Sequence, residues 1–89
     1  MIYNIFNIVF TKKAEDQLKK LPKNIQIRVI SVLKRISINP HNYVRRVVGT
    51  NFFRVRIGDY RAIIDINEKE ITILVLFVAH RKNIYKNKF

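Results

Sequence analysis

Apolar and polar residues alternate along the chain with two different periods, and these periods predict its secondary structure. Residues 2–10 are dense in Ile, Val and Phe, as is typical of a strand. From about residue 12 to residue 20 the apolar side chains return every three or four positions, which predicts a short amphipathic helix. These helical positions are Ala14, Leu18 and Leu21. Thr11 precedes the helix, where its hydroxyl can cap the first turn.

A second, longer helix is predicted over residues 23–37, with its apolar side chains on one broad face. They are Ile25, Val29, Ile30, Val32, Leu33 and Ile36. Pro22 separates this helix from the first, so the two form a helical hairpin. Pro40 ends it, because the residue before a proline avoids helical backbone. Ile27 and Ile38 fall off the apolar face. Either they form an exposed patch for a partner, or they touch the first helix and the chain beyond the second.

The rest of the chain has the pattern of strands joined by tight turns. The predicted strands cover residues 44–48, 52–57, 60–66 and 70–80, and Gly58-Asp59 has the composition of a hairpin turn. The strand over residues 52–57 alternates, so one face carries Phe53, Val55 and Ile57 and the other carries Phe52, Arg54 and Arg56. The basic segment after His80 is expected to form a short helix or an irregular tail.

These elements predict an α+β fold in one domain spanning residues 1–89. An N-terminal strand is followed by the helical hairpin and then by an antiparallel meander of three or four strands. The helices are expected on one face of the sheet, because each has a single apolar stripe to bury. The other face is expected to stay partly open, with the arginines of the 52–57 strand pointing there.

Charge adds a strong functional signal to this fold. Eighteen Lys and Arg residues face six Asp and Glu, giving a net charge of +12 and an isoelectric point near 10.5. The stretch between Asp16 and Asp59 contains basic residues and no acid, and the last nine residues are again basic without acid. Such a field attracts polyanions, which favours a nucleic-acid target over a merely solvated lysine surface. Its self-repulsion also predicts an acidic partner protein.

Several classes of protein are disfavoured by what the chain lacks. It has no cysteine for disulfides or thiolate metal sites, and His41 and His80 lie too far apart in sequence to suggest a metal site, so no cofactor is expected. No apolar run approaches the roughly 18 residues of a membrane span, and the N-terminus lacks the features of a signal peptide. The cytoplasm is therefore the expected location. No phosphate-binding glycine loop or nucleophile elbow is present.

Four arginines are candidates for a phosphate-binding cluster. Arg54 and Arg56 share a strand face, Arg61 lies just past the turn on the next strand, and Arg81 follows the last strand. If these strands pair as a meander, the four guanidinium groups could converge, and guanidinium binds phosphate through two parallel hydrogen bonds. The alternative is that arginines on a solvent-facing strand only protect the sheet from aggregation.

Two further residues are candidates near this cluster. His80 is one candidate, because histidine is the side chain that most often transfers protons in catalysis. Alternatively, it packs on the sheet or hydrogen bonds to a carbonyl. Tyr85 could stack on a base or donate its hydroxyl to a phosphate, or it could anchor the tail to the core.

Two stretches resemble the RelE/ParE toxin superfamily. The run FRVRIGDYR, residues 53–61, resembles its central hairpin, and VAHRKNIY, residues 78–85, resembles its C-terminal motif. The helical hairpin ahead of the meander matches as well, so the resemblance covers essentially the whole chain. It implies a RelE-like fold and a toxin of a type II toxin–antitoxin system, with an acidic RelB-like antitoxin as partner.

The RelE-like branch implies a ribosome-dependent endoribonuclease, an mRNA interferase that stops translation. In that chemistry a 2′-hydroxyl attacks the adjacent phosphate and the 5′ oxygen leaves. By position, Arg61, Arg81 and Tyr85 match residues of the family's site, and Arg54 and Arg56 stand where well-known members carry lysines. Because arginine is a poor proton acceptor, the hypothesis is that His80 or Tyr85 transfers protons while the arginines stabilise the phosphate.

Two other functions fit the same residues. ParE-like members of the superfamily share the fold and much of the hairpin motif, and they inhibit DNA gyrase without cutting RNA. A basic RNA-binding protein without catalytic activity would also have this charge. Ribosome and mRNA are the expected partners only under the first interpretation.

Overall fold

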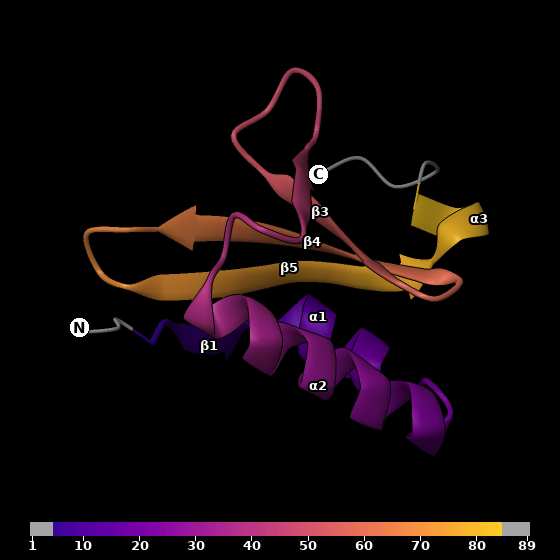
Figure 1. The fold of residues 1–89 in the computed structure, drawn as a ribbon. Helices are drawn as coiled ribbons and strands as arrows, with labels where there is room; N and C mark the ends of the chain where they lie inside the picture. The colour runs from indigo at the N-terminus through magenta and orange to yellow at the C-terminus, as the bar shows by residue number, and fades with distance from the viewer. Residues whose placement is uncertain (1–4, 85–89) are drawn as a thin grey trace.

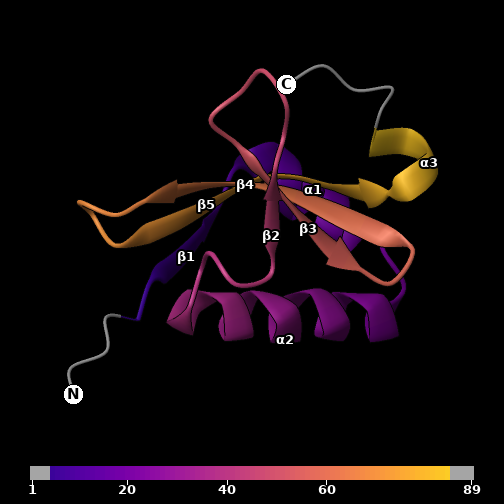
Figure 2. The same ribbon diagram turned by 45° about the horizontal axis from the view of Figure 1, so that its top comes forward.

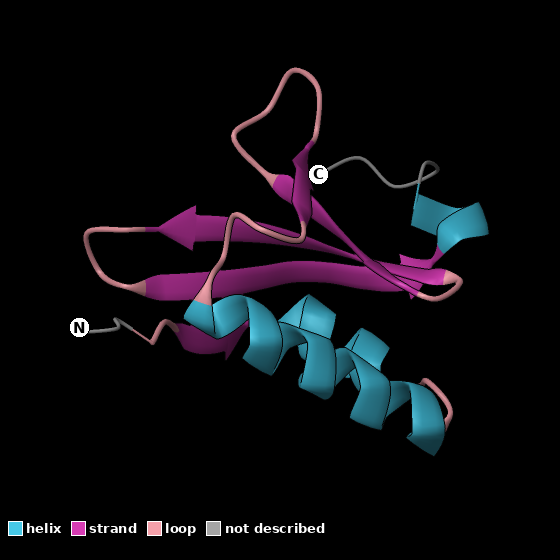
Figure 3. Cartoon of the chain, in the orientation of Figure 1, coloured by secondary structure: helices cyan, strands magenta, loops and turns pink. Residues whose placement is uncertain are grey.

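The computed structural model describes residues 5–84 and folds them into a five-stranded sheet with three helices (Figures 1 and 3). In chain order the elements are β1 (Asn7–Phe10), α1 (Lys12–Lys19), α2 (Lys23–Ile38), β2 (Val44–Arg46), β3 (Phe53–Ile57), β4 (Tyr60–Asn67), β5 (Thr72–His80) and α3 (Arg81–Ile84). None of the helices in this described part has both the length and the apolar character needed to cross a membrane.

The strands are arranged in the order β1-β5-β4-β3-β2. β2 to β5 form the predicted antiparallel meander, with Ile57 and Tyr60 paired across the two-residue turn between β3 and β4. β1 pairs with β5 in parallel, from Asn7 opposite Thr72 to Phe10 opposite Val75. The parallel pair can form because the helical hairpin and the meander together return the chain beside β1.

The main core lies between the helices and one face of the sheet. The helices contribute Ala14, Val29, Leu33 and Ile36, and the strands contribute Val55, Ile57, Ala62, Ile64, Ile73, Val75 and Val78. Figure 1 shows α2 running below the sheet, and Figure 2 shows it from the side, parallel to the sheet. The apolar face predicted for this helix is the one that is buried, which confirms the helical period found in the sequence.

α1 protects the part of β5 that β1 leaves unpaired. The hydroxyl of Thr11 accepts a hydrogen bond from the N–H of Ala14 at 3.1 Å and donates to the carbonyl of Leu76 at 3.2 Å. The side-chain oxygen of Gln17 accepts a hydrogen bond from the N–H of Val78 at 2.8 Å. The predicted cap is therefore confirmed. The same helix also satisfies backbone groups of a strand edge that would otherwise invite another strand.

A β-bulge at Leu76 changes which side of the sheet the end of β5 faces. Ile63 of β4 pairs with Phe77, but the next residue, Ile64, pairs with Val75, so Leu76 is the extra residue. Ile73 and Val75 belong to the helix-side core, whereas Phe77 and Ala79 pack on the opposite side with Ile63. Residues after the bulge therefore lie on the face opposite to the one that uninterrupted alternation would give.

Four predicted strands are longer than those observed, and of these β3 differs by one residue, since it begins at Phe53 rather than residue 52. β1 begins at Asn7 rather than residue 2, and residues 1–4 lie outside the described part. β2 ends at Arg46, because the chain turns at Thr50, whose N–H donates to the carbonyl of Val47 at 3.1 Å. β5 begins at Thr72, because Ile71 has a φ of 51° and leaves the extended conformation. Of the two forms expected after His80, the chain adopts the short helix.

Candidate nucleic-acid interface

Arginines line the face of the sheet that the helices leave open. On this open face the pairing of β2, β3 and β4 aligns residues in rows across the strands. One row contains Arg45, Arg54 and Ile63. The neighbouring row contains Arg56 and Arg61. Continuing the register of β2 and β3 by one residue places Tyr43, which directly precedes β2, opposite Arg56. The first row is therefore basic on β2 and β3, and the second row is basic on β3 and β4.

Five residues from these rows enclose a hollow of about 270 Å³, here called the arginine pocket. Its lining residues are Tyr43, Arg45, Arg54, Arg56 and Arg61. None of the five is a carboxylate, and they come from three strands and the residue that precedes one of them. Four positive groups in one hollow repel each other, so a bound anion would lower the energy of the arrangement.

The guanidinium of Arg61 is held in place by the hairpin turn. Its Nη1 donates to the carbonyl oxygens of Gly58 and Tyr60, each at 2.8 Å. Gly58 has a φ of 60°, a backbone conformation that residues other than glycine rarely adopt. The turn therefore fixes one face of the pocket before any ligand binds, which reduces the entropy lost on binding.

The acidic groups of the described chain that form ion pairs do so away from this pocket. Lys12 pairs with Asp16, Lys19 with Glu15 and His41 with Glu68. The hydrogen bond from Lys12 to Asp16, with the charge of that carboxylate, raises the pKa of Lys12. Arg56 is exposed and has no ion-pair partner among residues 5–84. An open, basic hollow of this kind suits phosphate, which accepts several guanidinium hydrogen bonds at once.

The structure brings together Arg54, Arg56 and Arg61 of the predicted cluster, but Arg81 does not line the pocket. Arg81 begins α3, its side chain is exposed, and its N–H donates to the carbonyl of Asp59 at 2.8 Å. The backbone of Arg81 therefore lies next to the turn between β3 and β4, and Arg56 and Arg61 lie on either side of that turn. Tyr85 lies outside the described residues.

His80 lies on the helix side of the sheet, away from the arginine pocket. It pairs with Tyr60, a residue packed against the main core, and the two rings meet edge to face at 5.3 Å. Its Nδ1 accepts a hydrogen bond from the N–H of Lys82 at 3.2 Å. The expectation that His80 stands beside the arginines is thus wrong in geometry, because the bulge at Leu76 changed the face on which it emerges.

Sequence reasoning missed Tyr43 and Arg45 as pocket residues. Arg45 lies within the predicted strand 44–48, and the signal was its alternation with Val44 and Arg46. That alternation fixes a shared face but not the neighbouring strand. Only the pairing of β2 with β3 places Arg45 opposite Arg54.

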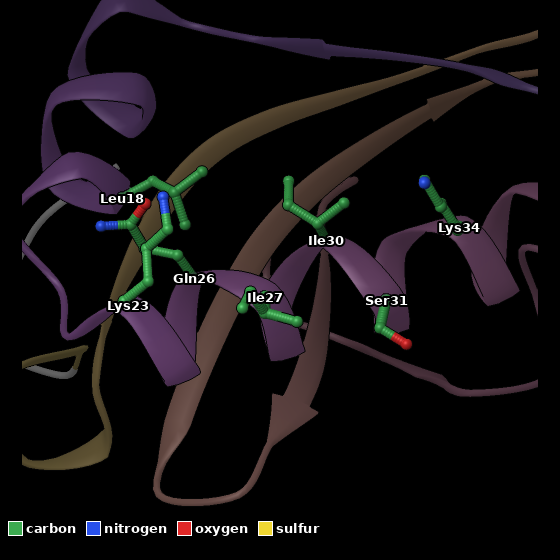
Figure 4. A pocket seen from close by; sticks show the side chains of 7 residues that line it. All are labelled: Leu18, Lys23, Gln26, Ile27, Ile30, Ser31 and Lys34. Carbon is green, nitrogen blue, oxygen red and sulfur yellow. The ribbon is translucent and has the colours of Figure 1, made fainter.

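A second hollow lies on the helices, between α1 and the outer side of α2 (Figure 4). This helix groove has a volume of about 390 Å³ and is lined by Leu18, Lys23, Gln26, Ile27, Ile30, Ser31 and Lys34. Ile27 is 62% exposed in it, and Ile38, which is 56% exposed, lies outside it. Both side chains are therefore exposed, but only Ile27 lines the groove, which it shares with Leu18 of α1.

Within residues 5–84 no group of three or more His, Asp or Glu side chains is placed to hold a metal ion. The side chains that line the arginine pocket are arginines and one tyrosine.

Comparison with known proteins identifies the family. The model of the ParE toxin of type II toxin–antitoxin systems matches residues 8–85. The chain belongs to the RelE/ParE toxin superfamily. Two members of the superfamily are similar over nearly their whole length. Toxin RelE3 of Methanocaldococcus jannaschii is 31% identical over 84 residues, covering 88% of this chain and 93% of the relative. Toxin RelG of Mycobacterium tuberculosis is 33% identical over 86 residues, covering 91% and 97%.

Solved structures of RelE toxins share the fold. The toxin–antitoxin complex RelBE2 from Mycobacterium tuberculosis matches with a TM-score of 0.77 and 29% identity, over 85% of this chain and 98% of that one. The archaeal RelE–RelB complex from Pyrococcus horikoshii matches with a TM-score of 0.74 and 26% identity, over 86% and 96%. The α+β architecture predicted from the sequence is therefore that of the RelE toxins.

Proposed function

We propose that this RelE-type toxin is a ribosome-dependent endoribonuclease that acts on mRNA in the cytoplasm. The observation that carries the proposal is the arginine pocket, in which Arg45, Arg54, Arg56 and Arg61 converge on an open face without a carboxylate among the lining residues. A phosphate of single-stranded RNA is the anion that such a surface would bind in a translating cell.

The pocket would act by stabilising charge on phosphorus. When a 2′-hydroxyl attacks the adjacent phosphate, negative charge builds on the non-bridging oxygens before the 5′ oxygen leaves. Guanidinium groups that are already in position stabilise this charge, and removing one such donor typically costs about 10²–10³ in rate. Arg61, whose guanidinium is held by two carbonyl oxygens, would take this role, and Arg81 would approach from the adjacent turn.

Proton transfer needs a group other than these arginines, which stay protonated at all working pH values. His80 points to the other side of the sheet, so we assign it no contact with RNA at the arginine pocket. Tyr85, or a group of the ribosome, is left for this role. A His80→Ala variant should therefore keep the pH–rate profile of the wild type in ribosome-bound cleavage.

The cleavage assay uses purified protein, ribosomes and an mRNA of known sequence. Attack by a 2′-hydroxyl predicts one fragment ending in a 2′,3′-cyclic phosphate and another beginning with a 5′-hydroxyl. The matching family model is that of the ParE toxin, so a ParE-like function is the alternative. Inhibition of gyrase supercoiling by the wild type, without any mRNA cleavage, would establish it. Salt-sensitive RNA binding without fragments would indicate a non-catalytic RNA-binding protein.

The proposal includes an acidic RelB-like antitoxin that neutralises the toxin. RelE proteins similar to this chain were solved in complex with their antitoxins. The helix groove offers a place for an apolar, acidic segment, because exposed Ile27 lies between Lys23 and Lys34. The charge of +12 also favours an acidic partner.

Paired substitutions test the antitoxin site. Ile27→Asp should weaken binding of a RelB-like antitoxin, because it places a negative charge in the apolar groove. Ile38→Asp is the matched control, since Ile38 is equally an exposed isoleucine of α2 but lies outside the groove. Equal binding by both variants would remove the helix groove from the proposal while leaving the nuclease assignment intact.

A further inference from the structure

Tyr43 is an aromatic side chain at the rim of the arginine pocket without an evident structural task. It is 55% exposed, and its hydroxyl has no hydrogen-bond partner among the described residues. An exposed aromatic ring gains little stability for the fold. It is therefore available to a ligand in the pocket that it lines.

Strand alternation sets the direction of Tyr43. In β2 and the loop after it, Val44 packs with the helix-side core and Val47 packs with the cluster on the open face. Arg45 shares the open face and lines the pocket. Tyr43, two residues before Arg45, emerges on this same face beside Arg56.

The segment that carries Tyr43 is fastened just before it. Pro40 is buried, and the Nε2 of His41 lies 2.6 Å from the Oε1 of Glu68 in the turn between β4 and β5. The ring of His41 also meets that of Phe53 edge to face at 5.7 Å. These contacts hold the backbone at Tyr43, so the ring is presented from a fixed position and a ligand loses less entropy by binding to it.

We propose that Tyr43 stacks on a base of the RNA whose phosphate occupies the arginine pocket. This inference rests on the proposed function, because it takes RNA as the ligand. Guanidinium contacts to phosphate position a nucleic acid but do not read its bases. Single-stranded RNA is typically held by such contacts together with aromatic rings on which bases stack. Tyr43 supplies the ring that the four arginines lack.

Stacking on Tyr43 would also make the toxin selective. The stacking energy grows with the area of the base, so a purine at this position should bind more tightly than a pyrimidine. Tyr43 is thereby a positioning residue. It fixes which nucleotide lies next to the phosphate that the arginines hold, and thus where the strand is cut.

A cycle of protein and RNA changes tests the stack. The probe is a short 2′-O-methyl RNA, which lacks the attacking hydroxyl, with either a base or an abasic site at each position in turn. Tyr43→Ala should weaken binding of the intact probe by about tenfold. At the position that stacks, the same substitution should have no effect on the abasic probe. Tyr43→Phe keeps the ring and should bind like the wild type.

The outcomes separate the stack from the proposed function. Weaker binding by Arg54→Gln and Arg56→Gln, with unchanged binding by Tyr43→Ala, would overturn the stack and leave the phosphate site standing. Loss of binding in Tyr43→Phe as well would show that the hydroxyl, not the ring, is the contact. If the wild type bound no RNA, alone or on the ribosome, both the stack and the nuclease assignment would fall.

The cleavage assay provides a second readout. On ribosomes carrying mRNA, Tyr43→Ala should shift or broaden the set of cut positions, and Tyr43→Phe should keep the wild-type pattern. A variant that only folded poorly would lower the yield of all fragments without changing their positions. An unchanged cut pattern in Tyr43→Ala would contradict the role in positioning.

Discussion

Residues of like charge that lie next to each other destabilise a protein unless a ligand or an acidic group offsets their repulsion. Arg45 and Arg54 are opposite each other on neighbouring strands, as are Arg56 and Arg61. Directly opposed like charges destabilise a sheet. Their presence in one pocket is therefore expected to trade some stability of the free toxin for affinity toward phosphate.

Arg56 provides the test of this trade. Arg56→Gln removes the charge but keeps a hydrogen-bonding side chain of similar length. Ribosome-dependent cleavage should fall by about 10²-fold, while the free energy of unfolding should stay the same or rise by about 0.3 kcal/mol as repulsion is relieved. Urea denaturation and the cleavage assay measure the two effects.

Arg35→Gln is the matched control, because Arg35 is an exposed arginine of α2 that lines neither hollow. It should leave cleavage within about twofold of the wild type, since rate losses of the size seen for a lost donor require direct contact with the phosphate. A large loss in Arg35→Gln would mean that total charge, rather than the pocket, determines activity.

The sequence was enough to find part of this site. Arg54 and Arg56 alternate within one strand and Arg61 follows a recognisable turn, so their shared face was predictable from period and turn chemistry. Arg45 joined them only through strand pairing, which local pattern does not encode. His80 was misplaced because a bulge leaves no reliable mark in a uniformly apolar run such as residues 73–79.

At the scale of elements, the fold depends on how α1 covers the exposed edge of β5. The helix is only eight residues long, which is short for independent stability, so its contacts with β5 hold it in place. Thr11 and Gln17 each hydrogen bond to the backbone of β5. Helix and strand edge therefore stabilise each other.

Gln17→Ala tests the edge contact. It leaves the N–H of buried Val78 without its acceptor, which should cost about 1–3 kcal/mol in the free energy of unfolding. Gln17→Glu keeps an acceptor oxygen at the same place and should lose clearly less. Chemical denaturation of the three proteins decides between them, and equal losses for Ala and Glu would contradict the role of this hydrogen bond.

Gly58→Ala tests the turn that holds Arg61. The new Cβ would require a strained φ of 60° and would meet Nη1 of Arg28 at 3.1 Å, so the protein should lose about 1–2 kcal/mol. Cleavage should fall further than stability explains, because the carbonyl of Gly58 orients Arg61.

Gly49→Ala is the control for conformational strain alone. Gly49 has a φ of 80°, and a Cβ there would have nothing within 4 Å. This variant should lose a similar part of its stability but keep the activity of its folded fraction. Loss of cleavage in both variants to the same degree would show that the turn has no special role.

Element types were predictable because α1 and α2 each carry an apolar stripe and the later strands are bounded by turns that contain Gly or Asn. The pairing of β1 with β5 was not predictable. A parallel pair has no connecting turn in the sequence, and the partners are separated by more than sixty residues. It forms because the hairpin and the meander bring these strands together in the core.

For the whole molecule, the charge of +12 predicts a binding constant that depends steeply on salt. Each phosphate neutralised on a single strand contributes a slope of about −0.7 in log K against log salt. The four pocket arginines therefore predict a slope near −3 for a short RNA probe. Arg54→Gln should reduce the magnitude of the slope by about 0.7, and Arg35→Gln should leave it unchanged. Fluorescence titrations at several salt concentrations provide the slopes, and identical slopes for all variants would indicate diffuse attraction.

The extra residue in β5 acts on everything that follows it in the chain. If Leu76 instead took its place in the regular alternation of β5, Ala79 and His80 would exchange sides and an imidazole would face the guanidinium groups. Deleting Leu76 would not have this effect, because it would close the bulge and leave each later residue opposite its present partner, with His80 across from Tyr60. Whether the extra residue is kept as a bulge or taken into the ladder thus decides which chemical groups this scaffold presents beside the arginine pocket.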